Sequence, residues 1–215
     1  MWAKLNSDKD TIEEIIVNPK TMTVDGITHP KTLFSLWTDA ERKAIGIVPV
    51  TTSGTSLNEK YYIEKDEAFA IAGDKNSVVR TIGVKDSDRK LADEDATDES
   101  GNKVKDKDGN QVINYGLKTQ AKDRATNNAN DLLQGFNWLI QRKVTADTAI
   151  PSAVVTYMAA VRTAHASICT AIDNASDIDA FKVLNTTEYN EDGSVKTIAK
   201  VDDWPDDSGV EGYRR

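Results

Sequence analysis

Residues 118–174 have the strongest periodic pattern of the sequence, and this pattern constrains the fold more than any other feature. The apolar residues recur at steps of three and four, which places them on one face of an α-helix. In the first half they are Ala121, Ala125, Ala129, Leu132, Leu133, Phe136, Leu139 and Ile140. In the second half they are Val154, Tyr157, Met158, Val161, Ala164, His165, Ile168 and Ile172. Since neither helix buries its apolar face alone, we expect an antiparallel helical hairpin.

The ends of these helices also have sequence signals. Residues 144–149 form the connection, and Pro151 suits the first position of the second helix, where its missing N–H costs nothing. Gly135 interrupts the first helix; we interpret it as tolerated, with close approach of another backbone as the alternative. A third, short helix follows, with Ser176 as its expected N-cap and a face made by Ile178, Phe181 and Leu184.

The sequence predicts an α+β fold in four parts. Residues 1–83 form a small mixed N-terminal module with β-hairpins, and residues 84–117 an acidic polar linker with one small hairpin. Residues 118–184 form the helical hairpin module, and residues 185–215 an acidic C-terminal arm.

Two local signals stand out in the N-terminal module. Asp25-Gly26 lies between short runs of strand-forming residues, which predicts a hairpin with a type I′ turn. Thr38 and Glu41 have the spacing of a capping box, which predicts a short helix over residues 39–44.

The strand assignments in this module are less specific. Residues 12–17 are compatible with strand or helix. Residues 47–50 contain Pro49 and are expected to be an edge strand, because proline cannot donate a hydrogen bond to a neighbouring strand. Three further short runs are expected to form a small meander, namely residues 61–63, 68–71 and 77–82, with a turn at residues 73–76.

Two polar turns are expected later in the chain. Asp106, Asp108 and Asn110 surround Gly109 in a pattern similar to the start of a calcium-binding loop, but the later ligand positions are missing. We therefore interpret this stretch as a hairpin turn. Residues 190–193 predict a second hairpin, with residues 194–201 as its second strand.

Composition excludes several partners. The 215 residues carry a net charge of −8, which argues against nucleic acids and anionic membrane surfaces. No apolar run approaches the roughly 18 residues of a membrane span. The first residues lack the order of a signal peptide, so we expect synthesis in the cytoplasm. Cys169 is the only cysteine and is interpreted as a small buried apolar residue.

No pattern of catalytic residues emerges. The two histidines, His29 and His165, lack the spacing of metal ligands, and both are interpreted as structural. The two glycine-rich phosphate-binding patterns, G-x-G-x-x-G and G-x-x-x-x-G-K-[ST], are both absent from the sequence. The sequence therefore predicts a non-enzymatic protein without cofactor or metal.

Two groups of residues carry a family resemblance. The first comprises Arg124, Leu132-Leu133, Asn137-Trp138, Ile150-Pro151, Tyr157 and Val161-Arg162. It resembles the helical hairpin of tail-fibre-assembly-like and tail-assembly-chaperone-like proteins of tailed bacteriophages. Two positions depart from that pattern, since Asn137 replaces an Asp and Met158 replaces an Arg. The second group resembles small proteins of phages of aquatic bacteria, cyanophages included: Met1-Trp2, Asn18-Pro19-Lys20, Gly26, His29-Pro30, Leu36-Trp37, Ala44-Ile45-Gly46-Ile47 and Tyr61-Tyr62.

The resemblance implies a structural or adaptor protein of a phage tail, associated with tail fibres and located in the virion after synthesis in the host cytoplasm. Its implied partners are other tail or tail-fibre proteins, or a second copy of the chain. One alternative is an assembly chaperone for tail fibres that is absent from the mature virion. A more remote alternative is a cation- or sugar-binding domain.

Aromatic residues are the candidate partner-binding sites, because aromatic side chains anchor protein interfaces. The candidates are Trp2, Trp138, Trp204 and Tyr213. Trp204 is expected to pack against a neighbouring chain or against the N-terminal module. Deletion of residues 202–215 is accordingly expected to leave the melting of the helices unchanged.

Overall fold

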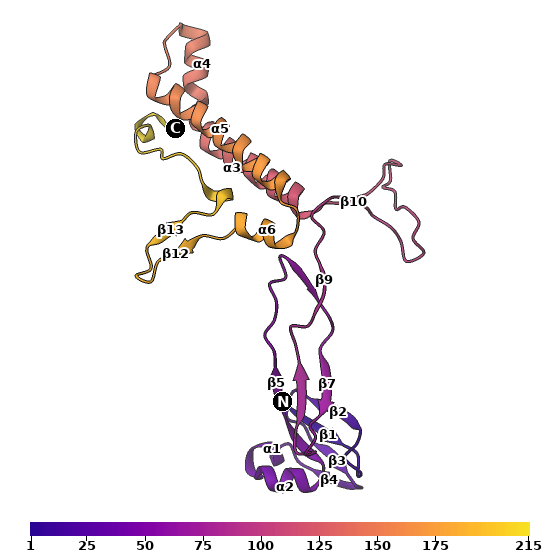
Figure 1. Ribbon diagram of the computed structural model, residues 1–215. Helices are drawn as coiled ribbons and strands as arrows, with labels where there is room; N and C mark the ends of the chain where they lie inside the picture. Colours follow the sequence, from indigo (N-terminus) through magenta and orange to yellow (C-terminus); the bar gives the residue numbers. More distant parts are fainter. The chain divides into compact units, whose positions relative to one another are not determined.

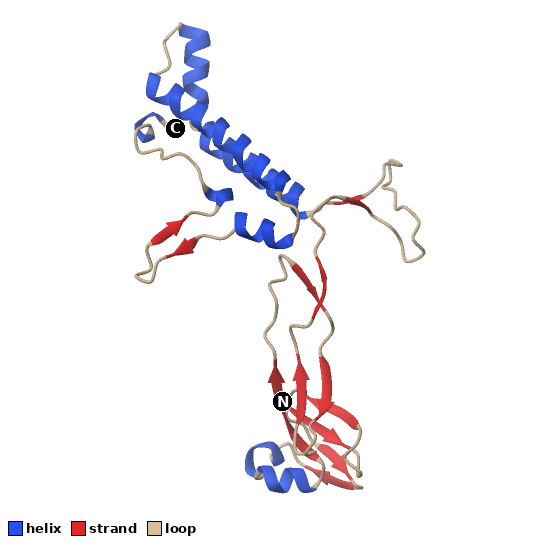
Figure 2. Cartoon of the chain, in the orientation of Figure 1, coloured by secondary structure: helices blue, strands red, loops and turns tan.

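A computed structural model describes residues 1–215, and the chain divides into two compact units, Met1–Asp88 and Arg89–Arg215 (Figure 1). The first unit is rich in strands and the second in helices, which confirms the α+β class (Figure 2). The predicted linker, residues 84–117, is not a separate segment. Its first residues pair within the N-terminal unit, and the rest belong to the C-terminal unit.

The N-terminal unit is built on a five-stranded sheet with the order β2-β1-β5-β8-β7. Its pairs are antiparallel except β5–β8, which is parallel. The other strands of this unit form two separate two-stranded sheets, β3–β4 and β6–β9. The elements are β1 (Trp2–Leu5), β2 (Ile12–Ile16), β3 (Met22–Val24), β4 (Ile27–His29), α1 (Leu33–Leu36), α2 (Asp39–Ala44), β5 (Ile47–Ser53), β6 (Tyr62–Glu64), β7 (Ala68–Ile71), β8 (Val78–Thr81) and β9 (Lys85–Asp88).

Both local predictions in this unit are confirmed. Asp25 and Gly26 have φ values of 49° and 78°, as a type I′ turn between β3 and β4 requires. The Thr38 hydroxyl accepts a hydrogen bond from the Glu41 N–H, and the Glu41 carboxylate accepts one from the Thr38 N–H. This capping box begins α2. The helix ends at Ala44, two residues before Gly46, whose φ is 76°.

The prediction that Pro49 marks an edge strand is wrong, because β5 lies between β1 and β8. β5 pairs with β1 through Ile47–Pro49 and with β8 only from Val50 onward. The N–H of Val50 donates to the carbonyl of Met1. Since alternate N–H groups point to opposite sides of a strand, the nitrogen of Pro49 points away from β1, where the β8 ladder has not yet begun. The strand therefore accommodates proline without losing a ladder bond.

The predicted meander is half right. β7 and β8 form an antiparallel hairpin across the turn at residues 72–77. β6, however, pairs with β9 and not with β7. Sequence reasoning did not predict β9 as the partner of β6. Its residues Lys85–Asp88 are all polar, so they lack the alternation of apolar residues that indicates a strand.

Apolar side chains cover both faces of the main sheet. On one face they meet α1 and the β3–β4 hairpin, in a cluster of Ile16, Met22, Val24, Leu33, Phe34 and Ile47. The other face carries a second cluster, Ala3, Leu5, Val48 and Val78, with Phe69 and Ile71 packed against it. The Lys75 ammonium donates to the carbonyl of Asp8, which ties the β7–β8 turn to the β1–β2 turn.

Two glycines allow the chain to pass from the main sheet to the β6–β9 ladder. Gly54 and Gly83 have φ values of 92° and 72°. A Cβ on Gly54 would overlap the carbonyl oxygen of Ile82, and a Cβ on Gly83 would overlap that of Thr55. At each glycine the backbone of the opposite segment lies so close that any side chain would overlap it, so only glycine fits.

We predict that Gly83→Ala lowers the free energy of unfolding of the N-terminal unit by more than about 1 kcal/mol, because the positive φ and the backbone overlap both oppose a side chain. Gly73→Ala is the matched control, since its Cβ meets nothing within 4 Å and its φ is not positive. Urea denaturation of the two variants measures the difference. Equal stability of both variants would contradict the close approach.

The C-terminal unit is centred on α3 and α5, which pack side by side (Figure 1). The Lys122 ammonium near the start of α3 pairs with Asp173 near the end of α5 at 2.8 Å, so the helices are antiparallel, as predicted. The elements are β10 (Glu94–Asp95), β11 (Ile113–Asn114), α3 (Leu117–Gln134), α4 (Asn137–Ala146), α5 (Ser152–Asn174), α6 (Ile178–Leu184), β12 (Glu188–Tyr189), β13 (Val195–Thr197) and the 3₁₀ turns η1 (Lys200–Asp202) and η2 (Glu211–Tyr213).

The first arm of the hairpin is two helices and not one. α3 ends at Gln134 and α4 begins at Asn137, and Phe136 between them is fully buried. The interpretation of Gly135 as merely tolerated is also wrong. Its Cβ would lie 3.3 Å from the side chain of Arg214, and its carbonyl accepts a hydrogen bond from the N–H of Arg215. Close approach of the C-terminal segment, the alternative reading, is what the structure shows.

Residues of the predicted linker cap the start of α3. The N–H groups of Leu117 and Lys118 donate to the carbonyls of Lys90 and Leu91. The Asp93 carboxylate accepts from the N–H of Gly116 at 2.8 Å. Free N–H groups at a helix start need such partners, so this segment is bound to the helix by ordinary capping.

The two polar turns are confirmed. The Asp106 carboxylate accepts hydrogen bonds from the N–H groups of Asp108 and Asn110, which closes a hairpin turn. β12 and β13 form the second hairpin, although β13 ends at Thr197 and not at residue 201. The N-cap of α6 is Asp177 and not Ser176, because the Asp177 carboxylate reaches the N–H of Ala180 at 2.8 Å.

We predict that Ile168→Ala lowers the free energy of unfolding of the C-terminal unit by about 2–5 kcal/mol, because Ile168 is fully buried and its loss leaves a cavity. Leu132→Ala has a smaller effect, since Leu132 is only half-buried. Asn130→Ala, on the exposed face of α3, changes stability by less than about 0.5 kcal/mol. Thermal melts that rank these three variants differently would contradict the assignment of helix faces.

Candidate partner-binding site

Three of the four aromatic residues predicted as partner-binding come together at one end of the helical unit. Trp138, Trp204 and Tyr213 surround the junction of α3 and α4, where the C-terminal segment returns to the helices. Trp2 is elsewhere, in the core of the N-terminal unit, where its ring lies 4.9 Å from that of Phe34. The structure therefore separates Trp2 from the other three.

Backbone contacts hold the last residues against the junction. The indole N–H of Trp138 donates to the carbonyl of Tyr213 at 2.9 Å. The N–H of Arg215 donates to the carbonyl of Gly135 at 3.1 Å, and its guanidinium lies 4.0 Å from the centre of the Trp138 ring. The Trp138 side chain thus attaches the C-terminal segment to the helices, whereas Tyr213 contributes its backbone carbonyl and its side chain is 38% exposed.

Arg214 is the central residue of this attachment, and sequence reasoning missed it. Its guanidinium lies 5.5 Å from the ring centre of Phe136 and 5.8 Å from that of Tyr157. It also donates to the Tyr157 hydroxyl at 3.1 Å and pairs with Asp207 at 2.9 Å. Burial raises the pKa of Tyr157 above its ordinary value, although the nearby Arg214 charge acts in the opposite direction.

Trp204 packs against the buried cluster of its own helical unit, an arrangement that the sequence did not predict. Val210 from the same segment is part of that cluster and is 4% exposed. The Trp204 indole N–H and the Arg214 Nε are buried without a hydrogen-bond partner, and each such group costs about 1–3 kcal/mol. Apolar burial and the contacts of Arg214 must offset this cost.

A groove runs beside the C-terminal segment. It has a volume of about 440 Å³ and lies between the first turns of α5 and residues 205–210. Its walls are mostly small or apolar, including Ala153, Ala160 and Val210. The groove contains no convergent set of charged groups.

A second recess lies at the other end of α5, between α6 and the base of the β12–β13 hairpin. Its volume is about 580 Å³, and Val183, Leu184 and Ile198 contribute its apolar walls. Val183 is 71% exposed and Ile198 53% exposed. Every residue of β12 and β13 is exposed, including Tyr189 and Val195.

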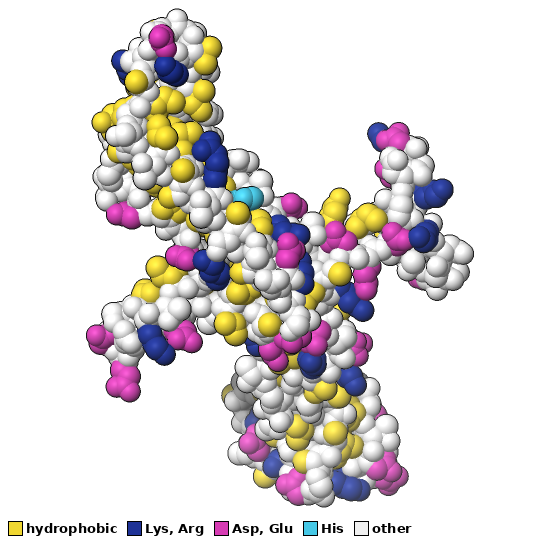
Figure 3. All heavy atoms as spheres, turned by 45° about the horizontal axis from the view of Figure 1, so that its top comes forward, with side chains coloured by type: hydrophobic (Ala, Val, Ile, Leu, Met, Phe, Trp, Pro, Cys, Tyr) yellow, Lys and Arg dark blue, Asp and Glu magenta, His cyan; other side chains and the backbone are white.

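Exposed apolar side chains also occur on α4, where Ile140 and Val144 are 39% and 79% exposed. Figure 3 shows that hydrophobic side chains reach the surface over the helices in several places. A two-stranded hairpin is marginally stable in water unless something covers it. The exposed residues of β12 and β13 therefore lack the cover that would stabilise such a hairpin.

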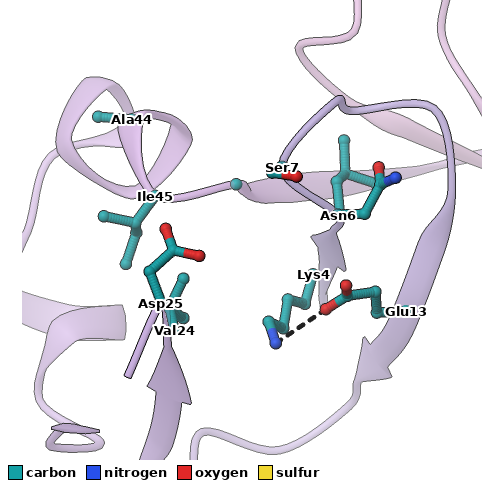
Figure 4. Close-up of a pocket in the computed structure, with 10 residues that line it drawn as sticks. Lys4, Asn6, Ser7, Glu13, Val24, Asp25, Ala44 and Ile45 are labelled. Atoms are coloured by element: carbon teal, nitrogen blue, oxygen red, sulfur yellow. Dashed lines mark ion pairs between the residues drawn. The ribbon is translucent and has the colours of Figure 1, made fainter. Parts of the chain in front are cut away.

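A small polar pocket in the N-terminal unit is shown in Figure 4. Its volume is about 170 Å³, below the roughly 300–1,000 Å³ of ligand pockets. Lys4 in its wall pairs with Glu13 at 2.8 Å, and Asp25 faces it from the β3–β4 turn. The charges of the pocket are thus largely compensated within the chain.

The remaining candidates for chemistry have structural contacts. The ring of His29 lies edge-on to Trp37 at 5.2 Å. The Nε2 of His165 contacts the Thr126 hydroxyl at 3.1 Å and the Cys169 sulfur at 3.5 Å. Cys169 is half-buried, and burial raises the pKa of its thiol. No cluster of three His, Cys, Asp or Glu side chains has the geometry of a metal site.

No protein-family model, curated protein or solved structure matches this chain. None of its helices is both long and apolar enough to cross a membrane.

We predict that Arg214→Ala lowers the free energy of unfolding of the helical unit by about 1–3 kcal/mol, because it removes charge-assisted hydrogen bonds to Tyr157 and Asp207. Glu211→Ala, an exposed change in the same segment, has little effect. Chemical denaturation followed by circular dichroism measures both. If Arg214→Ala and Glu211→Ala had the same free energy of unfolding, the contacts of Arg214 would not contribute to the stability of the helical unit.

We predict that deletion of residues 202–215 lowers the melting temperature of the helices, contrary to the expectation from the sequence. The deletion removes Val210 from the buried cluster and Trp204 from its edge, and so exposes apolar surface to water. Differential scanning calorimetry of the truncated and full-length chains tests this. An unchanged helical transition would restore the earlier expectation.

Proposed function

We propose that this chain is a non-enzymatic structural or adaptor protein of a bacteriophage tail, associated with tail fibres and acting through protein–protein contacts. The observation that carries the proposal is the β12–β13 hairpin, whose residues are all exposed although two of them, Tyr189 and Val195, are large and apolar. Such a hairpin gains stability when another chain covers it.

The second polar arm supports the same function. Residues 94–114 contain the β10–β11 pair and two isolated bridges, Thr97–Lys103 and Lys105–Gln111. Most of their side chains are exposed, and Ala96 is the one buried residue in the range. An arm of this kind presents backbone edges and charged side chains to a neighbour and encloses no substrate.

The resemblance to tail-fibre-assembly-like proteins supplies the tail as the location. Its helical motif falls on α3, α4 and the first half of α5, which form the attachment point for the C-terminal segment. Trp138 and Tyr157 of that motif both contact this segment. The motif residues thus maintain the geometry from which the contact surfaces project.

Quantitative mass spectrometry of washed virions tests the proposal, in a phage that encodes this chain. We expect the chain at a fixed ratio to a known tail protein. Absence from the virion, together with loss of fibres when the chain is not made, favours the assembly chaperone. Virions that assemble and adsorb normally without the chain would contradict both functions.

A double variant tests the hairpin itself. Tyr189→Ser with Val195→Ser is expected to reduce incorporation into virions while leaving the melting temperature unchanged, because both side chains are exposed. The matched control is Asn127→Ser with Asn130→Ser on the exposed face of α3. Equal incorporation of the double variant and the control would remove the hairpin as a contact site.

A further inference from the structure

The arm of residues 94–114 contains the same short unit twice in succession. Residues 97–104 read TDESGNKV and residues 105–112 read KDKDGNQV, so four of the eight positions are identical. We call these units the first leaf and the second leaf. The identical pairs are Asp98 and Asp106, Gly101 and Gly109, Asn102 and Asn110, and Val104 and Val112.

The two leaves fold into the same turn. In each leaf the Asp carboxylate accepts hydrogen bonds from the N–H two residues later and from the Asn N–H, all at 2.9 Å. It also accepts one from the Asn side-chain amide at 3.2 Å. These bonds from the Asn backbone and side chain hold the pKa of Asp98 and of Asp106 below the ordinary value, because they stabilise the charged carboxylate. Each turn is therefore closed by one ionised side chain.

A closed ring of three backbone hydrogen bonds joins the leaves to the β10–β11 stem. The N–H of Ala96 donates to the carbonyl of Val112 at 2.8 Å, the N–H of Val112 to Val104 at 3.0 Å, and the N–H of Val104 to Ala96 at 2.9 Å. The Gln111 side-chain amide donates to the carbonyls of Ala96 and Val112 as well. Three pairs of segments meet at this ring, and Figure 1 shows the two leaves as loops beyond β10. The pairs are Thr97–Lys103, Lys105–Gln111 and the stem pair Asp95–Ile113.

The stem is in turn joined to the start of α3. The Asp93 carboxylate, directly before β10, accepts from the N–H of Gly116 at 2.8 Å and from the Thr119 hydroxyl at 3.0 Å. A Cβ on Gly116 would lie 2.4 Å from the backbone of Ala92, so the two sides of the stem are in close contact at its base. A continuous series of hydrogen bonds thus leads from both leaves, through the ring and the stem, to the first turn of α3.

We infer that the two leaves, the ring and the stem form one cooperative element, and that this element keeps the first turn of α3 capped. Each ring residue takes part in two of the three ring bonds, so displacement of one residue breaks two bonds. A single leaf is a turn with one bridge, and so small a hairpin is marginally stable in water. Each leaf therefore depends on the ring, and through the ring it depends on the other leaf.

This inference goes beyond the proposed function and does not rest on it, because it concerns the purified chain. Its consequence for contacts is that the arm is formed before any neighbour binds. A preformed element loses less conformational entropy on binding than a segment that orders on contact. The arm and the uncovered β12–β13 hairpin are thus two different kinds of contact element.

Amide hydrogen exchange of the full chain, followed by NMR, tests the cooperativity. Asp106→Ala removes the acceptor that closes the second leaf. We expect exchange to become about tenfold faster in the second leaf, at the ring amides and in the first leaf, because loss of charge-assisted hydrogen bonds opens the whole element. At the N–H groups of residues 116–118 we expect a smaller increase of about threefold, since Lys90 and Leu91 still accept from α3. Exchange in the middle of α5 should not change.

Asp108→Ala is the matched control. It removes the same charge from the same turn, but the exposed Asp108 carboxylate accepts no hydrogen bond. Exchange in the first leaf and at the ring should therefore stay at the wild-type rate. An effect of Asp108→Ala equal to that of Asp106→Ala would mean that charge alone is responsible, and would overturn the inference.

The reciprocal variant Asp98→Ala should loosen the second leaf as strongly as Asp106→Ala loosens the first. The variant with both substitutions should exchange little faster than either single variant, because one substitution already opens the element. Additive effects of the two substitutions, or faster exchange confined to the substituted leaf, would show that the leaves fold independently. Faster exchange throughout α5 would show general destabilisation and would contradict the path to the start of α3.

A milder variant covers the case in which Asp106→Ala leaves the arm without assignable resonances. Asp106→Asn keeps one acceptor oxygen and removes the charge, so its effect should have the same distribution and a smaller size. The same outcomes decide: a joint increase in both leaves and at the ring supports one cooperative element, and an increase in residues 105–111 alone refutes it.

Discussion

The packing of α3 against α5 is the constraint on which the exposed surfaces of the C-terminal unit depend. Neither helix buries its apolar side alone, so the pair is the smallest stable unit, and fully buried residues such as Val161 and Ile168 hold it together. The 23 residues of α5 then act as a rigid spacer. One end carries α4 and the C-terminal segment, and the other carries α6 and the β12–β13 hairpin. The surfaces available for contact are separated because this pair fixes their distance.

The sequence predicted the parts of the fold that depend on neighbouring residues. Asp25-Gly26 and the Thr38–Glu41 capping box act within four positions of the chain, and both were read correctly. The errors concern contacts between residues far apart in the sequence. Pro49 lies in a central strand because β5 changes partners beside it, and β6 pairs with a polar strand that has no apolar pattern. No local signal contains this information.

The candidate site was predictable to a similar degree. Aromatic side chains in a polar segment pointed to Trp204 and Tyr213, and Trp138 was also among the candidates. Their segment is attached to its own helices through Arg214, which contacts Phe136 and Tyr157, and an arginine near the end of a polar segment gives no signal of this role in the sequence. The recess between α6 and the β12–β13 hairpin could not be predicted either, because Val183 and Ile198 belong to separate segments that only the fold brings together. Exposure decides the role of such residues, and exposure follows from tertiary structure.

The central claim is that the exposed arms of the C-terminal unit are contact surfaces, whereas the α3–α5 pair is a scaffold. Hydrogen–deuterium exchange of the purified chain, compared with the chain in its assembled state, tests this most directly. The account predicts fast exchange of residues 188–197 in the free chain and clear protection in the assembly, with α3 and α5 equally protected in both. Hairpin amides that exchange at the same rate in the two states would contradict it.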